Sequence, residues 1–193
     1  GRVSGYSLEQ INQMRKHFGT SPARQNSEKC VRLAVQSFKG GVSKSITTVY
    51  LAQYLALKGY RVLIVDCDPQ ASATSSFGFV PDRSFDEKDT IGQYLEGVEE
   101  SLHYCIKSTY FPGIDLIPSC LPLYEAEFGL FNAVSHAETA EEKRDYYHEF
   151  SNAISTVEED YDIVLLDSPP ALGMISINIL VAANAVLVPT PPS

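Results

Sequence analysis

The most constraining feature of this sequence is a strand, a glycine-rich turn, a helix and a second strand that follow one another between residues 31 and 66. The segment VRLAVQS is followed by FKGGVSK, then by SITTVYLAQYLALK up to Gly59, and then by RVLIVD. Two parallel strands need a crossover, most often a helix, and a nearly continuous apolar strand is typical of one buried on both faces. The pattern predicts an α/β fold with a mainly parallel sheet and helices on both faces.

Beyond Asp66, helices and strands continue to alternate along the chain. In order, they are expected at residues 90–102 (helix), 114–119 (strand), 122–157 (helical region), 162–166 (strand), 173–183 (helix) and 185–188 (strand). The chain stops at Ser193, just past a strand tip, where α/β proteins place ligand-contacting loops. We therefore expect the domain to be truncated at its C-terminus.

A short amphipathic helix is expected near the N-terminus, apart from this domain. Ser7 and Gln10 have the spacing of a capping box, and Gly19 is suited to end the helix. Apolar residues recur between them at helical intervals: Leu8, Ile11, Met14 and Phe18. A polar stretch without periodicity follows, which is the composition of a linker. We therefore divide the chain into an N-terminal helix and linker, residues 1–29, and a domain, residues 30–193.

The charge is distributed unevenly along the chain. Residues 1–32 hold six Lys/Arg against two Asp/Glu, whereas the remainder holds nine against twenty-two. An acidic body repels polyanions, so contact with DNA needs a local basic patch or a segment outside this chain.

Membrane, secreted and metal–thiolate proteins are poor matches to this sequence. The apolar run 175–188 is interrupted by Asn178 and Asn184 and is shorter than the ~20 residues of a membrane-spanning helix. No apolar core follows a basic N-terminal start, so we expect a cytoplasmic location. The cysteines have no paired spacing, which favours reduced thiols over a zinc site or disulfides. They are Cys30, Cys67, Cys105 and Cys120.

The glycine-rich turn is suited to bind phosphate groups. Consecutive backbone N–H groups at a helix N-terminus bind phosphates well, and Gly40 and Gly41 allow close approach. Lys44 is placed to reach the β- and γ-phosphates, and the Ser45 hydroxyl to coordinate Mg²⁺. Taken alone, the segment could also be a glycine turn followed by a surface lysine.

The match to the phosphate-loop pattern G-x-x-x-x-G-K-[ST] is imperfect. Phe38 stands at the position of the first glycine and Ser43 at that of the second. The loop prediction therefore needs support from elsewhere in the chain.

Three acidic residues at strand ends supply that support. Asp167 ends the apolar strand DIVLLD, and Asp66 and Asp68 follow the strand after the loop's helix. A single such Asp more often caps a helix or a turn. In an open parallel sheet, however, the carboxyl ends of the strands and the phosphate loop share one edge, so the three acids and Lys44 are expected to converge on one crevice.

These segments also carry a family resemblance. KGGVSKS, DCDPQASATSSFG from Asp66 and YDIVLLDSPP from Tyr161 resemble the deviant Walker-A ATPases of the ParA family. The similarity runs from about Val31 to Ser193. It is strongest to the larger, type Ia plasmid-partition members, whose mid-domain and linker segments resemble PGIDLIPSCLPLYEAE and YSLEQINQMRKHFG.

The resemblance implies a role for each of the predicted site residues. Asp68 would position or activate the attacking water, Asp66 would lie near the Mg²⁺ shell, and Asp167 would be the Walker-B acid that holds Mg²⁺ with Ser45. Lys39 would be the signature lysine that reaches the nucleotide of the opposite subunit. The nucleotide-binding segment would comprise Lys39, Gly40, Gly41, Val42, Ser43, Lys44, Ser45 and Ile46.

The implied function is an ATP-driven switch in DNA partition that binds ATP or ADP with Mg²⁺. ATP would close a homodimer that binds DNA non-specifically, through regions outside this chain, and a ParB-type centromere-binding partner would stimulate hydrolysis. The location would be cytoplasmic and nucleoid-associated, with no membrane partner.

Two alternatives remain open at this point. One is a MinD-like positioning ATPase, which needs a membrane-binding amphipathic helix that is not visible here. The other is a nucleotide-binding DNA repressor with little hydrolysis, motivated by Ser43 and by Ile46, which replaces a hydroxyl residue usual in the family.

Overall fold

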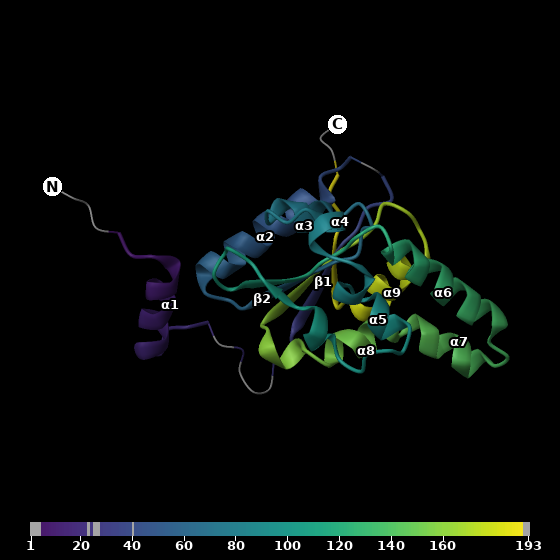
Figure 1. Cartoon of the computed structure of the whole chain (residues 1–193). Coiled ribbons are helices and arrows are strands. Elements are labelled where there is room, and N and C mark those ends of the chain that lie inside the picture. The colour runs from purple at the N-terminus through teal and green to yellow at the C-terminus, as the bar shows by residue number, and fades with distance from the viewer. Residues whose placement is uncertain (1–4, 23, 25–27, 40, 191–193) are drawn as a thin grey trace.

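A six-stranded sheet forms the centre of the molecule in a computed structural model of the chain (Figure 1). The structure describes residues 5–22, 24, 28–39 and 41–190. The strand order is β3-β4-β2-β5-β1-β6. The strands are β1 Val31–Val35, β2 Val62–Asp66, β3 Lys107–Ser108, β4 Ile114–Ile117, β5 Ile163–Asp167 and β6 Ala185–Leu187. Every pair is parallel except β3 with β4, so the predicted mainly parallel sheet is confirmed.

Helices cover both faces of the sheet, as the sequence predicts (Figure 1). On one face lie α2 and α3; on the other lie α6, α8 and α9. The helices are α1 Leu8–His17, α2 Lys44–Lys58, α3 Ser72–Ser76, α4 Pro81–Ser84, α5 Gly92–Leu95, α6 Leu123–His136, α7 Ala140–Tyr147, α8 Glu149–Ser155 and α9 Met174–Ala182. Short 3-10 turns are η1 Glu87–Asp89, η2 Leu102–Cys105 and η3 Glu158–Asp160.

The central strand β2 shows why the sheet needs both layers. All five of its residues are buried. Val62 and Ile64 pack into the core beneath α2, whereas Leu63 and Val65 pack into the core on the opposite face. Because successive side chains of a strand point to opposite faces, an unbroken apolar strand is stable only between two helical layers.

Most of the predicted strands and the last helix lie within two residues of their observed bounds, but one helix prediction is wrong in extent. The helix expected over 90–102 is limited to Gly92–Leu95, because Gly97 takes a left-handed φ of 72° and turns the chain away. The predicted helical region 122–157 is confirmed; it consists of three helices, since the backbone becomes extended at Ala137 and leaves helical geometry at His148. The antiparallel strand β3 was not predicted.

The N-terminal helix has the predicted start and end. Ser7 and Gln10 form a capping box, and Gly19 follows the helix with a φ of 64°. None of the helix's residues is buried. Its contact with the body is polar: the Arg15 guanidinium donates a hydrogen bond of 3.0 Å to the carbonyl oxygen of Leu57, near the end of α2. The division into residues 1–29 and 30–193 stays a prediction.

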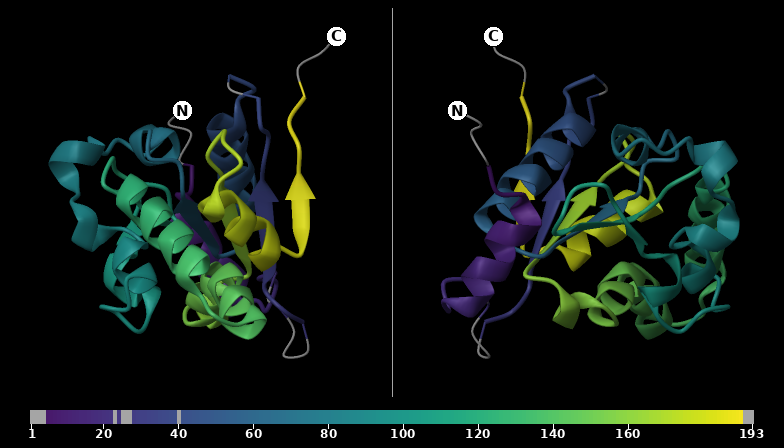
Figure 2. Two further views of the ribbon diagram at one scale, coloured as in Figure 1. Left: turned by 90° about the vertical axis from the view of Figure 1, so that its right-hand side faces the viewer. Right: turned by 60° about the vertical axis from the view of Figure 1, so that its left-hand side comes forward.

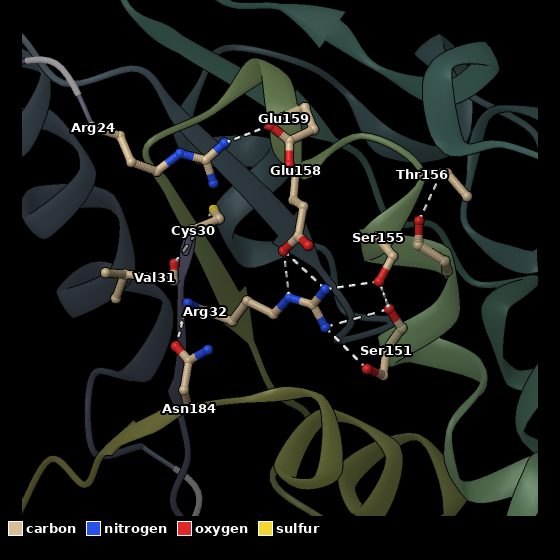
Figure 3. Close-up of polar contacts among 11 residues, drawn as sticks. Arg24, Cys30, Val31, Arg32, Ser151, Ser155, Thr156, Glu158, Glu159 and Asn184 are labelled. Atoms are coloured by element: carbon tan, nitrogen blue, oxygen red, sulfur yellow. Dashed lines mark hydrogen bonds and ion pairs between the residues drawn. The ribbon is translucent and has the colours of Figure 1, made fainter. Parts of the chain in front are cut away.

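A buried arginine fixes the amino end of β1 (Figure 3). The Arg32 guanidinium, only 8% exposed, forms an ion pair of 2.8 Å with Glu158. It also donates to the hydroxyl groups of Ser151 and Ser155, at 2.9 Å and 2.8 Å. The backbone N–H of Arg32 donates to the side-chain oxygen of Asn184, next to β6 at the edge of the sheet (Figure 2). A buried charge needs such partners, and these connect β1 to α8 and β6.

Two predicted absences concern the described part of the chain. Among its helices, none has the length and apolarity needed to cross a membrane. The cysteines at positions 30, 67, 105 and 120 are buried and free. Burial raises the pKa of the Cys30 thiol to about 11, so this group is a weak nucleophile at neutral pH.

Candidate functional site

The turn between β1 and α2 has the backbone geometry of an anion-binding loop. Gly41 has a φ of 75° and Ser43 has a φ of 61° and a ψ of 33°, both in the left-handed region. Successive backbone N–H groups in such turns form a concave surface that binds anions, and the helix N-terminus that follows adds positive potential. Gly40 lies outside the described residues.

A cavity of about 450 Å³ opens in front of this loop. Its walls come from the loop, the start of α2, the turn after β2 and the segment after β5. The lining residues are Gly41, Val42, Ser43, Lys44, Ser45, Ile46, Asp68, Gln70, Ser72 and Pro170. The structure thus brings most of the predicted nucleotide-binding segment together with Asp68 at the carboxyl edge of the sheet.

A larger cavity of about 640 Å³ lies at the opposite, amino edge, between the linker and the body. It is lined by Arg24, Lys29 and Leu55 among others, and no glycine-rich turn or helix N-terminus contributes to its wall. The smaller cavity is therefore the candidate for the predicted nucleotide site, because its wall carries the anion-binding backbone.

Lys44 begins α2 and is only 8% exposed. An ammonium group held this close to a helix N-terminus adds a full charge to the positive end of the helix dipole. Burial raises the pKa of Asp167, and the positive charge of Lys44 offsets part of that rise. This interaction agrees with the convergence predicted from the sequence.

Asp66 and Asp167 are paired across neighbouring strands. Their Cα atoms are register partners between β2 and β5, so both side chains point to the face covered by α2. Burial raises the pKa of both carboxyl groups, and the charge of Asp167 raises that of Asp66 further. Two acids this close are costly to ionise without a cation or donor hydrogen bonds nearby.

The carboxylate of Asp167 is only partly satisfied. Its Oδ1 accepts a hydrogen bond of 3.0 Å from the Thr48 hydroxyl, one turn into α2. The Ser45 and Thr48 hydroxyl groups lower its pKa against the effect of burial. Its Oδ2 is buried and has no hydrogen-bond partner among the described residues. One oxygen of Asp167 therefore has no partner in the described protein, and the residue is fully buried and is not among those that line the cavity.

Asp66 is satisfied by the protein itself. Its Oδ2 accepts hydrogen bonds from the Thr74 backbone N–H at 2.8 Å and from the Thr74 hydroxyl at 2.7 Å. Its Oδ1 accepts one from the Asp68 backbone N–H at 3.2 Å. These bonds tie the end of β2 to α3, so Asp66 shapes the turn that carries Asp68.

Asp68 both caps this turn and lines the cavity. Its Oδ1 accepts a hydrogen bond of 3.0 Å from the Gln70 backbone N–H, and the turn closes through Ala71, whose φ is 53°. The side chain is 8% exposed. The simple capping role considered from sequence is therefore present, and the same carboxylate is in reach of a ligand in the cavity.

Lys39 is exposed and lies on the approach to the loop, outside the set of residues lining the cavity. In the part of the chain that the structure describes, its ammonium group forms no ion pair. Its position leaves it free to contact a second molecule.

Sequence reasoning missed the polar side chains that hold the acids in place. Thr48 and Thr74 each bond a strand-end carboxylate, and Gln70, Ser72 and Pro170 line the cavity. Thr48 lies four residues after Lys44, which puts both on neighbouring turns of one helix face. This spacing was the one sequence signal that could have identified Thr48, and no sequence signal pointed to Thr74.

Comparisons with known proteins agree with this geometry. The family model AAA_31, described as an AAA domain, matches residues 31–193. Protein SopA of Escherichia coli K12 is 42% identical over 99% of this chain and 50% of its own length. The chain spans about half the length of the curated relatives it matches.

Solved structures show the same fold with ligands. A cobyrinic acid a,c-diamide synthase from Mycobacterium smegmatis, with bound ATP analogue and magnesium, is 33% identical with a TM-score of 0.71, covering 83% of this chain and 60% of that one. A putative plasmid partition protein from Borrelia burgdorferi B31 bound to AMPPNP is 27% identical with a TM-score of 0.66, covering 83% of this chain and 61% of that one. On the match over residues 31–193 and the fold it shares with these proteins, the chain belongs to the ParA-type AAA domains of the AAA_31 family.

Proposed function

We propose that this chain is the nucleotide-binding part of an ATP-dependent DNA-partition switch. The observation that carries the proposal is the cavity in which the left-handed loop at Gly41 and Ser43, the buried Lys44 and the carboxylate of Asp68 meet. ATP is a ligand of the right chemistry, because loop amides, a helix N-terminus and a lysine together recognise a polyphosphate.

In this proposal the loop and α2 bind the phosphates. Backbone N–H groups between Gly40 and Ile46 would donate to the phosphate oxygens, and Lys44 would neutralise the β- and γ-phosphates. Relatives that bind ATP analogues and magnesium support the choice of nucleotide.

The site fits Mg²⁺ by the chemistry of its donors. The unpartnered Oδ2 of Asp167 and the Ser45 hydroxyl are hard oxygen ligands, which Mg²⁺ prefers together with phosphate oxygens. The bound ion would neutralise charge on the phosphates. Asp66 would support the site without binding Mg²⁺ directly, because its oxygens already accept hydrogen bonds from Thr74 and from the Asp68 backbone N–H.

For hydrolysis, we assign Asp68 to the attacking water. Its carboxylate would accept a hydrogen bond from the water, whose oxygen forms a bond to the γ-phosphorus while the bond between that phosphorus and the bridging oxygen breaks. The products are ADP, which keeps the bridging oxygen, and inorganic phosphate; the water's proton passes to Asp68 and then to solvent. Such positioning and acid–base help is typically worth ~10²–10⁴-fold in rate.

The partition role builds on the relatives. Exposed Lys39 would reach the nucleotide of a second copy in an ATP-bound homodimer, adding positive charge where the phosphoryl oxygens become more negative. The dimer would bind DNA non-specifically through regions outside this chain, because the body from residue 33 on is strongly acidic. A ParB-type partner would stimulate hydrolysis and release the DNA, in the cytoplasm at the nucleoid. The plasmid-partition proteins among the matches support this assignment.

Lys44 and Lys58, at the two ends of α2, allow a direct test of nucleotide binding. Lys44→Ala removes the charge facing the phosphates, and we expect the affinity for a fluorescent ADP to fall by ~10- to 100-fold, the usual range for bonds to a charged group. Lys58→Ala, at the other end of α2, is the matched control; Lys58 stacks on the exposed Tyr54 ring, 5.2 Å from its centroid, and its loss should leave affinity unchanged. Equal affinities for the two folded variants would remove the phosphate loop from this proposal.

A further inference from the structure

The carboxylate of Glu127, on α6, caps the N-terminus of α9. Its Oε1 accepts a hydrogen bond of 2.5 Å from the Met174 backbone N–H, and its Oε2 accepts one of 2.9 Å from the Ile175 backbone N–H. These are two of the N–H groups that a helix cannot satisfy within itself, and a negative charge at this end is also favoured by the helix dipole. The cap comes from a residue 47 positions away in sequence, so it is a tertiary contact.

Gly173 makes room for this contact. A Cβ built on Gly173 would stand 2.8 Å from Cδ of Glu127 and closer still to Oε1. The backbone of Gly173 is extended, with a φ of −119°, so alanine would be allowed there on conformational grounds alone. The backbone would therefore accept an alanine at this position, but its Cβ would have to displace the Glu127 carboxylate.

The capped helix end is also the end of a loop that reaches the nucleotide cavity. Residues 168–173 connect Asp167 to α9, and Pro170 in the middle of the loop lines the cavity. At its start the Ser168 backbone N–H lies 3.4 Å from the carbonyl oxygen of Val35. Further on, the buried Ser176 hydroxyl donates a bond of 2.5 Å to the carbonyl oxygen of Ala171. Glu127 holds the last point, so the loop is fastened at three places.

Glu127 lies on a part of α6 that is packed against the core. On either side of it along α6, Leu123, Ala126 and Leu130 are buried in the core that also contains Met174 and Ile175. The carboxylate is therefore held by packing on one helix and by hydrogen bonds to the next. A side chain held in this way keeps a fixed position and so can position the loop to which it is bonded.

We propose that Glu127 is a positioning residue for ATP hydrolysis, acting through the N-terminus of α9 on the loop between Asp167 and Gly173. The inference rests on the proposed function for its hydrolytic readout. In the proposed role, Glu127 touches neither nucleotide nor Mg²⁺. It fixes the position of Pro170 relative to Asp167, the last residue of β5. Its loss should therefore slow hydrolysis and leave phosphate binding at Lys44 unchanged.

Hydrogen exchange tests the contact without relying on activity. In Glu127→Ala, we expect the backbone amides of Met174 and Ile175 to exchange at least about tenfold faster, as loss of a bond to a charged acceptor predicts. Glu127→Gln should give the same direction of change, because an amide offers one acceptor oxygen for two N–H groups. Glu125→Ala is the matched control, since Glu125 is exposed on the same helix. Unchanged exchange in a folded Glu127→Ala protein would overturn the proposal.

A double-mutant cycle with Gly173 separates positioning from general stability. Gly173→Ala should push the carboxylate off α9 and so reproduce Glu127→Ala: single-turnover hydrolysis should fall by ~10- to 100-fold, a usual effect of small misplacements at a reacting centre, while the Kd for ADP stays within about twofold. The double variant should be no slower than either single variant, because the steric conflict disappears with the carboxylate.

The remaining outcomes are each decisive. Additive losses in the double variant, or a loss of ADP affinity equal to the loss of rate, would show that Glu127 acts on stability or binding and would refute the positioning role. If the unmutated protein hydrolyses no ATP with DNA and partner present, the proposed function fails. The exchange rates at Met174 and Ile175 still show, in that case, whether Glu127 holds the loop.

Discussion

The Thr48 hydroxyl donates a hydrogen bond of 3.0 Å to Oδ1 of Asp167, which joins the first turns of α2 to the end of β5. Thr48 is fully buried, and its hydroxyl also lies 3.1 Å from the carbonyl oxygen of Lys44. One threonine thus connects the helix that carries the phosphate-binding lysine to the proposed Mg²⁺ ligand. With Oδ1 bonded to Thr48, Oδ2 of Asp167 is the oxygen without a partner among the described residues.

Thr48→Val should therefore destabilise the protein, and Mg²⁺-ADP should offset part of that loss. The isosteric change leaves the buried Asp167 carboxylate without its donor, which should cost ~1–3 kcal/mol of unfolding free energy. Added Mg²⁺ with ADP should restore part of this loss, because the ion supplies a new partner. Denaturant unfolding with and without Mg²⁺-ADP measures both quantities. Thr48→Ser, which keeps the hydroxyl, is the control, and a Thr48→Val protein as stable as the original would show that the bond contributes nothing.

Asp68→Asn should separate hydrolysis from binding. Asparagine can still accept the hydrogen bond of 3.0 Å from the Gln70 N–H, so the turn should survive while the charge is lost. We expect single-turnover hydrolysis to fall by ~10²–10⁴-fold with ATP affinity held or raised, and the ATP-bound dimer should accumulate. A rate within about threefold of the original protein, far below that range, would reduce Asp68 to a turn cap.

Lys39→Ala should spare the monomer and affect the dimer. The exposed side chain lies outside the residues that line the cavity, so ADP affinity should not change. ATP-dependent dimerisation and turnover should both fall, because the proposed partner of this ammonium group is the nucleotide of the second copy. Light scattering after size exclusion, with ATP and with ADP, measures the dimer. An intact ATP dimer with normal turnover would contradict the assignment.

Ser43→Gly should stabilise the loop. Ser43 has a φ of 61°, a conformation that costs a residue with a Cβ ~1–2 kcal/mol and costs glycine almost nothing. A gain of ~1 kcal/mol corresponds to a rise of ~2–4 °C in the Tm of a chain of this size. Thermal unfolding measures it, with Ser37→Gly, before the loop and outside the left-handed region, as the control. A lower Tm for Ser43→Gly than for Ser37→Gly would show that the serine side chain makes up for its strained backbone.

What the sequence by itself determined is local and periodic. The strand, turn and helix from Val31 to Lys58 are read from alternation, glycine and helical spacing within one segment, and a parallel pair then requires a crossover. The edge at which Lys44 and the acids gather follows from strand polarity alone. The position of the predicted site could therefore be derived without coordinates.

Only the tertiary structure decided how the acids differ. By strand pattern alone, Asp66, Asp68 and Asp167 were equivalent carboxylates at strand ends, and only the family resemblance gave them different roles. In the fold, Thr74 satisfies Asp66, the Gln70 backbone N–H occupies one oxygen of Asp68, and Asp167 retains an unpartnered oxygen. The cap of Glu127 on α9 was equally invisible, since 47 residues separate donor and acceptor. The physical reason is that propensity and periodicity act over a few neighbouring residues, whereas a hydrogen bond between elements depends on how packing brings distant side chains to within about 3 Å of each other.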